Sequence, residues 1–232
     1  TTEIYTLSLH DALPILDAAA PAPHRWSEVE QLLHKRRGLL DGVAINWKDN
    51  FDMARQPTEA GSRLLTGRIP GRDAQTLAAA TLQGLVCLGK THMTELAFSG
   101  LGLNPPVATV PNAFDPQLVA GGSSGGAAVS VAMGLAAAAI GTDTGGSIRL
   151  PAAWNGLVGF KPTPGAVDMT GIVPLCRRFD VAGPLARTVE GLPGLLDHGG
   201  VEPALRDVRG HVRVPVCGHE KSPPRRDVLS GG

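Results

Sequence analysis

The sequence predicts an α/β fold in which strands and helices pack in layers. Short apolar runs alternate with segments of helical periodicity between residues 42 and 163, as expected for strands that alternate with helices. Of the 232 residues, 43% are hydrophobic, so the chain can bury a sizeable core. No period of about 20–50 residues repeats, which excludes a solenoid.

The first half of the chain predicts two helices and two strands. A capping-box pattern followed by apolar residues at helical spacing predicts a helix over 27–38. The apolar run 43–45 predicts a buried strand, and the polar cluster Trp-Lys-Asp-Asn at 47–50 stands at its end. A second helix is expected to begin at an Asp73 N-cap, and residues 85–88 predict the next buried strand.

The second half predicts a loop, a buried helix and two more strands. Residues 104–117 contain too many prolines for a helix or a strand, so they should form a long loop. Residues 127–139 have no charged group on any face, which predicts a fully buried helix. A strand and turn should follow over 139–146, and another strand over 157–163. Because the helix is too apolar to be solvated, the glycine-serine runs at its two ends are not parts of a flexible linker.

Charge, cysteine content and hydropathy exclude several classes of protein. Basic and acidic residues balance at 21 each, so we expect no nucleic-acid partner and no anionic membrane surface. The three cysteines, Cys87, Cys176 and Cys217, are widely spaced, which predicts neither a disulfide framework nor a zinc ribbon and fits a reducing, cytoplasmic setting. The longest apolar run, 131–140, is far shorter than the roughly 20 residues that span a bilayer.

Three short motifs match known sites formally and are kept as less favoured alternatives. Residues 84–91 fit the phosphate-binding loop pattern, but that loop needs a strand before it and a helix after it, and here the order is reversed. The run GGSSGG fits a nucleophile elbow at Ser123 or Ser124, although it lacks a good preceding strand and its downstream histidines all follow residue 190. The single DTGG at 143–146 supplies only half of an aspartic-protease dyad.

A lysine and two serines offer a more complete chemistry. Lys48 follows an apolar strand, and burial lowers the pKa of a lysine so that its neutral amine can act as a base. Gly145 and Gly146 precede Ser147 and can present backbone N–H groups as an oxyanion hole, which makes Ser147 the candidate nucleophile. The spacing to Ser123 leaves room for one helix and one returning strand, so both serine loops should meet at one edge, where Ser123 can relay a proton.

These residues resemble the amidase signature family over about residues 42–190, through WKDN, GGSSGG, TGGSIRLPAA and GPLART. The resemblance implies a mixed β-sheet core layered between helices. It implies Lys48 as base, Ser123 as a relay preceded by a cis peptide bond, and Ser147 as nucleophile. It also implies an oxyanion hole built from the backbone of Thr144, Gly145, Gly146 and Ser147.

The resemblance further implies an amidase that hydrolyses a carboxylic amide C–N bond through an acyl-enzyme on Ser147. The expected substrate is a small-molecule amide, no cofactor or metal is expected, and a homodimer is one expected assembly. A glutamyl-tRNA amidotransferase A-type subunit is the alternative, but residues 93–105 lack the SSTENS-like stretch of such subunits. An inactive truncated remnant is the other alternative.

Five further residues have expected supporting roles. Ser124 should satisfy loop amides, and Asp143 and Arg149 should form a structural ion pair near the site. Trp154 is expected in the core. Glu95 should cap the loop that holds the site rather than act as an acid.

The resemblance also predicts how the chain is divided. Residues 1–16 are expected to be a non-native lead, residues 17–190 the amidase signature core, and residues 191–232 a divergent or degraded tail. The chain is about half the usual length of the family, so we expect it to be a fragment.

Overall fold

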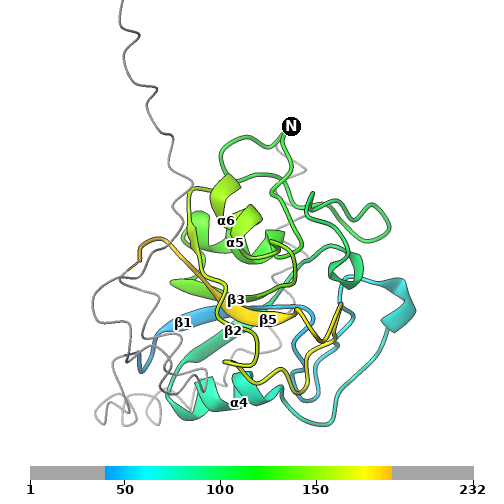
Figure 1. Ribbon diagram of the computed structural model, residues 1–232, viewed down its shortest axis with the longest axis vertical. Helices are drawn as coiled ribbons and strands as arrows, with labels where there is room; N and C mark the ends of the chain where they lie inside the picture. The colour runs from blue at the N-terminus through cyan, green and yellow to red at the C-terminus, as the bar shows by residue number, and fades with distance from the viewer. Residues whose placement is uncertain (1–39, 190–232) are drawn as a thin grey trace, which may run out of the picture.

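The computed structural model describes residues 40–189, drawn in colour in Figure 1. The helix predicted over 27–38 and the two expected terminal segments lie outside the described residues. The helices and strands are β1 (Ala44–Lys48), the 3-10 helix η2 (Arg63–Leu65), α4 (Gln75–Leu82), β2 (Val86–Thr91), the 3-10 helix η3 (Glu95–Ala97), α5 (Gly125–Ala132), β3 (Ala138–Asp143), α6 (Arg149–Trp154), β4 (Val158–Gly159) and β5 (Val181–Ala186).

The strands form one mixed sheet of five strands in the order β2-β1-β3-β5-β4. Strand β1 pairs in parallel with both β2 and β3, whereas β5 is antiparallel to β3 and to β4. Helices α5 and α6 lie on one side of the sheet and α4 lies on the other (Figure 1). The predicted α/β fold, a mixed sheet layered between helices, is therefore confirmed.

Each face of the sheet packs into its own core, because side chains alternate along a strand. On the α4 side, Ile140 of β3 belongs to the same buried cluster as Trp47 of β1 and Leu77 of α4. On the α5 side, Ala139 packs with Val131 and other small residues of the helix. Two apolar layers thus hold the carboxyl ends of β1 and β3 side by side.

The predicted helix over 127–139 is wrong in length. Helix α5 ends at Ala132, and residues 133–135 are exposed before β3 begins at Ala138. Gly134 has a φ of 74°, a left-handed conformation that glycine adopts readily at the end of a helix. The apolar alanines that follow belong to the buried strand, where they look the same in sequence as a buried helix.

Two other local predictions are also corrected. Asp73 does not cap α4, because Ala74 is the N-cap and the Asp73 carboxylate accepts a hydrogen bond from Ala54 N–H at 2.7 Å. Trp154 is not a core residue, since 41% of it is exposed. The strand predicted over 157–163 is reduced to β4, two residues long.

The competing motifs do not have the local structure that they need. Residues 86–91 of the apparent phosphate-binding loop form strand β2, so they cannot wrap around a phosphate. Within the described chain, no strand leads directly into Ser123, as a nucleophile elbow requires. The loop over 104–117 is confirmed, with only an isolated bridge between Pro111 and Val119 at its end.

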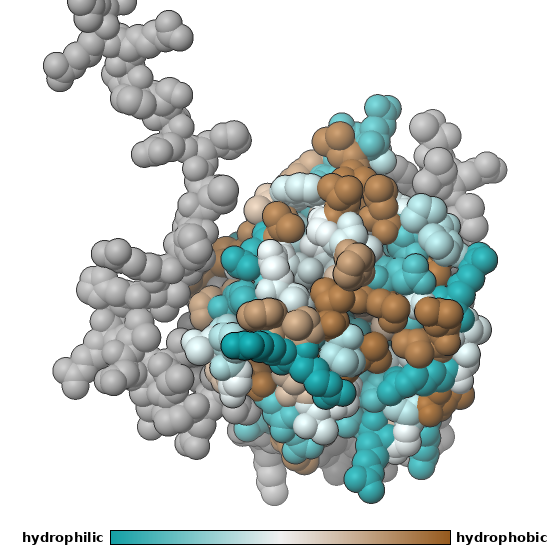
Figure 2. Space-filling model, turned by 45° about the vertical axis from the view of Figure 1, so that its right-hand side comes forward, coloured by the Kyte–Doolittle hydropathy of each residue, from teal (hydrophilic) through white to brown (hydrophobic). Residues whose placement is uncertain are grey.

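The surface mixes apolar and polar side chains, as the face in Figure 2 shows. The most exposed large apolar residues are Leu64 and Phe98, each with 82% of its surface accessible. Between residues 40 and 189, no helix combines the length and apolar character needed to cross a membrane.

Candidate active site

Lys48 ends strand β1 and is completely buried. Its Nζ atom donates to Ser123 Oγ at 2.7 Å and to Thr142 Oγ1 at 2.8 Å, with the Thr142 carbonyl at 3.4 Å. Burial lowers the pKa of Lys48 to about 7, although the charges of Asp143 and Asp180 act in the opposite direction. The amine is therefore placed and tuned to exchange a proton with the Ser123 hydroxyl near neutral pH.

Ser123 lies in a tightly packed turn before helix α5. The Gly122–Ser123 peptide bond is cis, as the resemblance implies. The Ser123 carbonyl accepts a hydrogen bond from Thr94 N–H at 3.2 Å, and the residue is completely buried. A Cβ on Gly122 would lie 2.6 Å from Thr94 Oγ1 and 2.7 Å from the Gly102 nitrogen, so only glycine fits beside this serine.

Ser124 and Ser147 join the two serine loops. The Ser124 N–H donates to the Ser147 carbonyl at 3.1 Å, which confirms that both loops meet at one edge of the sheet. The Ser124 hydroxyl does not satisfy a loop amide as expected, because it donates to the Thr142 carbonyl at 3.3 Å. Ser147 is 8% exposed, and its hydroxyl has no hydrogen-bond partner among residues 40–189.

The turn at 144–147 presents backbone donors beside Ser147. The N–H groups of Thr144, Gly145 and Ser147 have no hydrogen-bond acceptor in the part of the chain that the structure describes. Gly146 differs from the expectation, because its N–H donates to Asp143 Oδ1 at 2.8 Å. Three backbone donors, rather than four, are thus available to an oxyanion.

Asp143 holds the far side of this turn. Its fully buried carboxylate accepts hydrogen bonds from Ile148 N–H at 3.1 Å and from the Arg149 guanidinium at 3.0 and 3.1 Å. Burial alone would raise the pKa of Asp143, but the hydrogen bonds from Arg149 and Ile148 lower it below its ordinary value. The expected structural ion pair between Asp143 and Arg149 is confirmed.

Comparison with known proteins agrees with this arrangement. A family model described as Amidase matches residues 14–199. The chain belongs to the amidase family. The mixed sheet and the buried lysine and serines are thus the fold and the candidate centre of an amidase-family chain.

Several relatives and solved amidase structures resemble this chain over most of its length. The A-type subunit of glutamyl-tRNA(Gln) amidotransferase from Anaeromyxobacter sp. (strain K) is 41% identical over 83% of this chain and 37% of its own length. Indoleacetamide hydrolase of Pseudomonas syringae pv. syringae is 43% identical over 72% of this chain and 37% of its own. The crystal structure of native peptide amidase from Stenotrophomonas maltophilia superposes with a TM-score of 0.69 and 38% identity, covering 76% of this chain and 39% of that chain. The chain thus spans little more than a third of the curated relatives it matches.

Sequence reasoning missed two residues that support the lysine of this amidase-family chain. Thr142 lies within β3 and accepts from Lys48, while its Oγ1 also accepts from Asn50 Nδ2 at 3.1 Å. Asp180, which is 6% exposed, accepts a hydrogen bond from the Thr144 hydroxyl at 2.5 Å. Thr142 could have been found from its position two residues before Thr144 on the same strand, but no local signal marks Asp180.

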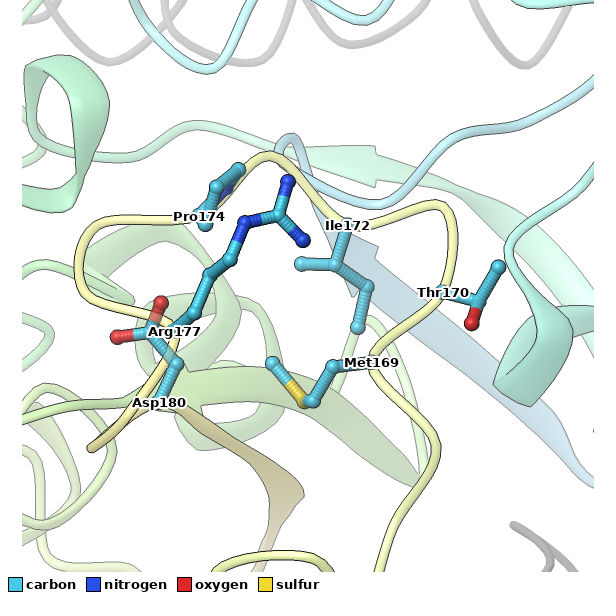
Figure 3. Close-up of a pocket in the computed structure, with 6 residues that line it drawn as sticks. All are labelled: Met169, Thr170, Ile172, Pro174, Arg177 and Asp180. Atoms are coloured by element: carbon cyan, nitrogen blue, oxygen red, sulfur yellow. The ribbon is translucent and has the colours of Figure 1, made fainter.

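A cavity of about 230 Å³ lies next to the turn that precedes Ser147. Figure 3 shows its lining side chains, which come from one loop: Met169, Thr170, Ile172, Pro174, Arg177 and Asp180. The hydrogen bond between Asp180 and Thr144 connects this lining to the turn. Glu95, expected to cap the loop that holds the site, accepts a hydrogen bond from the Ser62 hydroxyl at 2.7 Å. Residues 40–189 contain no cluster of His, Cys, Asp and Glu arranged to hold a metal ion.

Proposed function

We propose that this chain carries the catalytic centre of an amidase that hydrolyses the C–N bond of a carboxylic amide. The observation that carries the proposal is the contact between Lys48 and Ser123, in which a fully buried amine with a pKa near 7 donates to a serine hydroxyl. A lysine whose neutral form is populated at neutral pH is the general base that a serine hydrolase without a nearby histidine needs.

The first half of the reaction forms an acyl-enzyme. Neutral Lys48 accepts the Ser123 proton while Ser123 accepts the Ser147 proton, and Ser147 Oγ attacks the amide carbon. Negative charge develops on the amide oxygen, where the free N–H groups of Thr144 and Gly145 stabilise it. These donors are fixed before the reaction begins, so no reorganisation is needed when the charge appears.

The second half of the reaction releases both products. Ser123 donates its proton to the leaving amine and regains one from the protonated Lys48, so the C–N bond breaks and the acyl group remains on Ser147. Water then attacks the ester as its proton passes through Ser123 to Lys48. The carboxylic acid leaves and Ser147 recovers its hydroxyl proton.

Covalent labelling of Ser147 tests the proposal directly. A fluorophosphonate probe should phosphonylate the chain at Ser147, as located by mass spectrometry of the peptides, and Ser147→Ala should abolish the labelling. Ser130→Ala is the matched control, because Ser130 is a buried helix residue whose hydroxyl donates to the Ala127 carbonyl, away from the site. A folded chain that takes up no label at Ser147 would instead be the inactive remnant.

A second candidate function is that of an amidotransferase A-type subunit, and the similarity to that component of glutamyl-tRNA(Gln) amidotransferase favours it. The two functions differ in the amide that acylates Ser147. Hydrolysis of indoleacetamide without glutamine hydrolysis would support an amidase similar to indoleacetamide hydrolase. Release of ammonia from glutamine with no reaction of indoleacetamide would support the amidotransferase function.

The assembly and the location of the protein are proposed on weaker grounds. Cys87 and Cys176 are free thiols, which supports a cytoplasmic location. A homodimer is proposed from the family resemblance, and sedimentation of the purified chain tests it. A mass equal to one chain over a wide concentration range would exclude the homodimer.

A further inference from the structure

A loop far along the chain grips the turn that carries the backbone donors. Asp180 accepts the Thr144 hydroxyl proton on Oδ1 at 2.5 Å. Its Oδ2 accepts hydrogen bonds from the N–H groups of Leu175 at 3.0 Å and Cys176 at 2.9 Å. The carboxylate is therefore anchored in its own loop and directed at Thr144.

Lys161 makes a second connection between the same two segments. Its Nζ atom donates to the Asp143 carbonyl at 2.7 Å and to the Phe179 carbonyl at 3.1 Å. Asp143 and Phe179 directly precede Thr144 and Asp180, so two adjacent links fix the distance between the loop and the turn. Figure 3 shows Asp180 at the rim of the cavity, with its carboxylate directed away from the Arg177 guanidinium.

The turn needs such links, because two of its residues are glycines. Gly145 has no side chain to pack, and Gly146 has a φ of 142°, which non-glycine residues rarely adopt. Asp143 fixes the side of the turn that follows Gly146 through the Gly146 and Ile148 N–H groups. On the other side, Thr144 has its side-chain bond to Asp180.

We propose that Asp180 is a positioning residue that holds the oxyanion turn through the Thr144 hydroxyl, so that the Thr144 and Gly145 N–H groups face the substrate carbonyl. This inference rests on the proposed amidase function and adds a residue to its machinery. Asp180 also contributes a negative charge close to Lys48, and this charge raises the pKa of the lysine. The two effects can be separated by substitution.

Substitutions at Thr144 test the positioning role alone. Thr144→Ser keeps the hydroxyl and should retain most of the activity. Thr144→Val keeps the shape but loses the donor, and kcat for amide hydrolysis should fall by about tenfold or more with KM little changed, because oxyanion donors act in the transition state. Equal kcat values for Thr144→Val and the parent chain would overturn the proposal.

Substitution of Asp180 tests both effects. Asp180→Asn should lower kcat and move the midpoint of the rate against pH to lower pH, because Lys48 loses a neighbouring negative charge. Thr144→Val keeps that charge and should leave the midpoint in place. Asp168→Asn is the matched control, since Asp168 is exposed on the same loop and accepts a hydrogen bond from Thr170 N–H at 2.7 Å.

Nuclear magnetic resonance of the folded variants keeps the inference testable without turnover. The Gly145 amide resonance should shift and exchange faster with solvent in Thr144→Val and Asp180→Asn, while Thr144→Ser and Asp168→Asn should resemble the parent chain. The Lys48 side-chain resonance should titrate at lower pH in Asp180→Asn only. If the parent chain fails to acylate yet shows these shifts, only the proposed function is wrong, whereas an unchanged Gly145 resonance in both variants overturns the positioning role.

Discussion

The Nζ atom of Lys48 lies 2.7 Å from the Ser123 hydroxyl, in a part of the core from which water is excluded. The two residues are 75 positions apart, and the sheet brings them together because β1 and β3 run parallel and end at the same edge. Burial lowers the pKa of Lys48 to about 7 and so populates the neutral amine. The contact joins the place where a proton can be stored to the hydroxyl that passes it on.

The rate of Ser147 acylation should therefore depend on pH through Lys48. Only the neutral amine accepts a proton, so the rate should rise with pH and reach a plateau above a midpoint near pH 7. Stopped-flow or timed labelling with a fluorophosphonate across the neutral range measures it. The residual rate of Lys48→Met should be lower by about 10²–10⁴-fold and should lack this midpoint. A parent profile that is flat across neutral pH would show that another group is the base.

The stability of the fold should also depend on pH through the same lysine. The pKa is about 7 when folded and 10.5 in the reference state, so between these values the unfolded chain holds one proton more. The free energy of unfolding of the parent chain, relative to Lys48→Met, should consequently increase by about 1.4 kcal/mol per pH unit in this window. Below pH 7 both states bind the proton and the difference should become constant. Urea unfolding of both chains at several pH values measures it, and a constant difference above pH 7 would mean that Lys48 stays charged when folded.

Local sequence patterns were sufficient to find the proposed catalytic residues. Lys48 directly follows an apolar run, which marked it as the end of a buried strand. Ser123 and Ser147 each stand beside glycines, and the apolar stretch between them had the length of one helix and one strand. These features depend on neighbouring residues only, and for that reason the sequence revealed them.

The remaining elements depend on contacts between distant segments. Strand β5 contains Gly183 and Pro184, which argue against a central strand, yet all of its residues are buried between β3 and β4. Asp180 acts on a turn that lies 36 residues earlier in the chain. Helix α6 is six residues long, too short for a helical period to show.

Two adjacent glycines of GGSSGG should respond very differently to alanine. A Cβ on Gly126 would lie 2.6 Å from the His92 carbonyl oxygen and 2.7 Å from its nitrogen, and backbone atoms cannot move aside easily. Gly126→Ala should destabilise the fold by several kcal/mol, on the order of 3. Thermal unfolding followed by circular dichroism measures the change.

Gly125→Ala is the matched control for that substitution. Its Cβ would meet only Ala120 Cβ at 3.6 Å, an ordinary contact, and alanine favours a helix over glycine by about 1 kcal/mol. Gly125→Ala should consequently leave stability unchanged or raise it slightly. Equal losses in the two variants would mean that helix α5 does not pack against His92 as described.

Asp143 should contribute more to stability than its partner Arg149, because the carboxylate is fully buried while 46% of the Arg149 side chain is exposed. Asp143→Ala removes the acceptor for the Gly146 and Ile148 N–H groups and should lower the free energy of unfolding by about 3–5 kcal/mol. Arg149→Ala leaves those bonds, with Lys161 Nζ at 3.7 Å from the carboxylate, and should cost roughly 1 kcal/mol after solvent screening. Because the folded pKa of Asp143 lies below 3.8, its contribution should be present above pH 3.8 and lost as the pH falls through the folded value. Urea unfolding of both variants checks the order, and a larger loss for Arg149→Ala would show that the ion pair, rather than the backbone donors, fixes the turn.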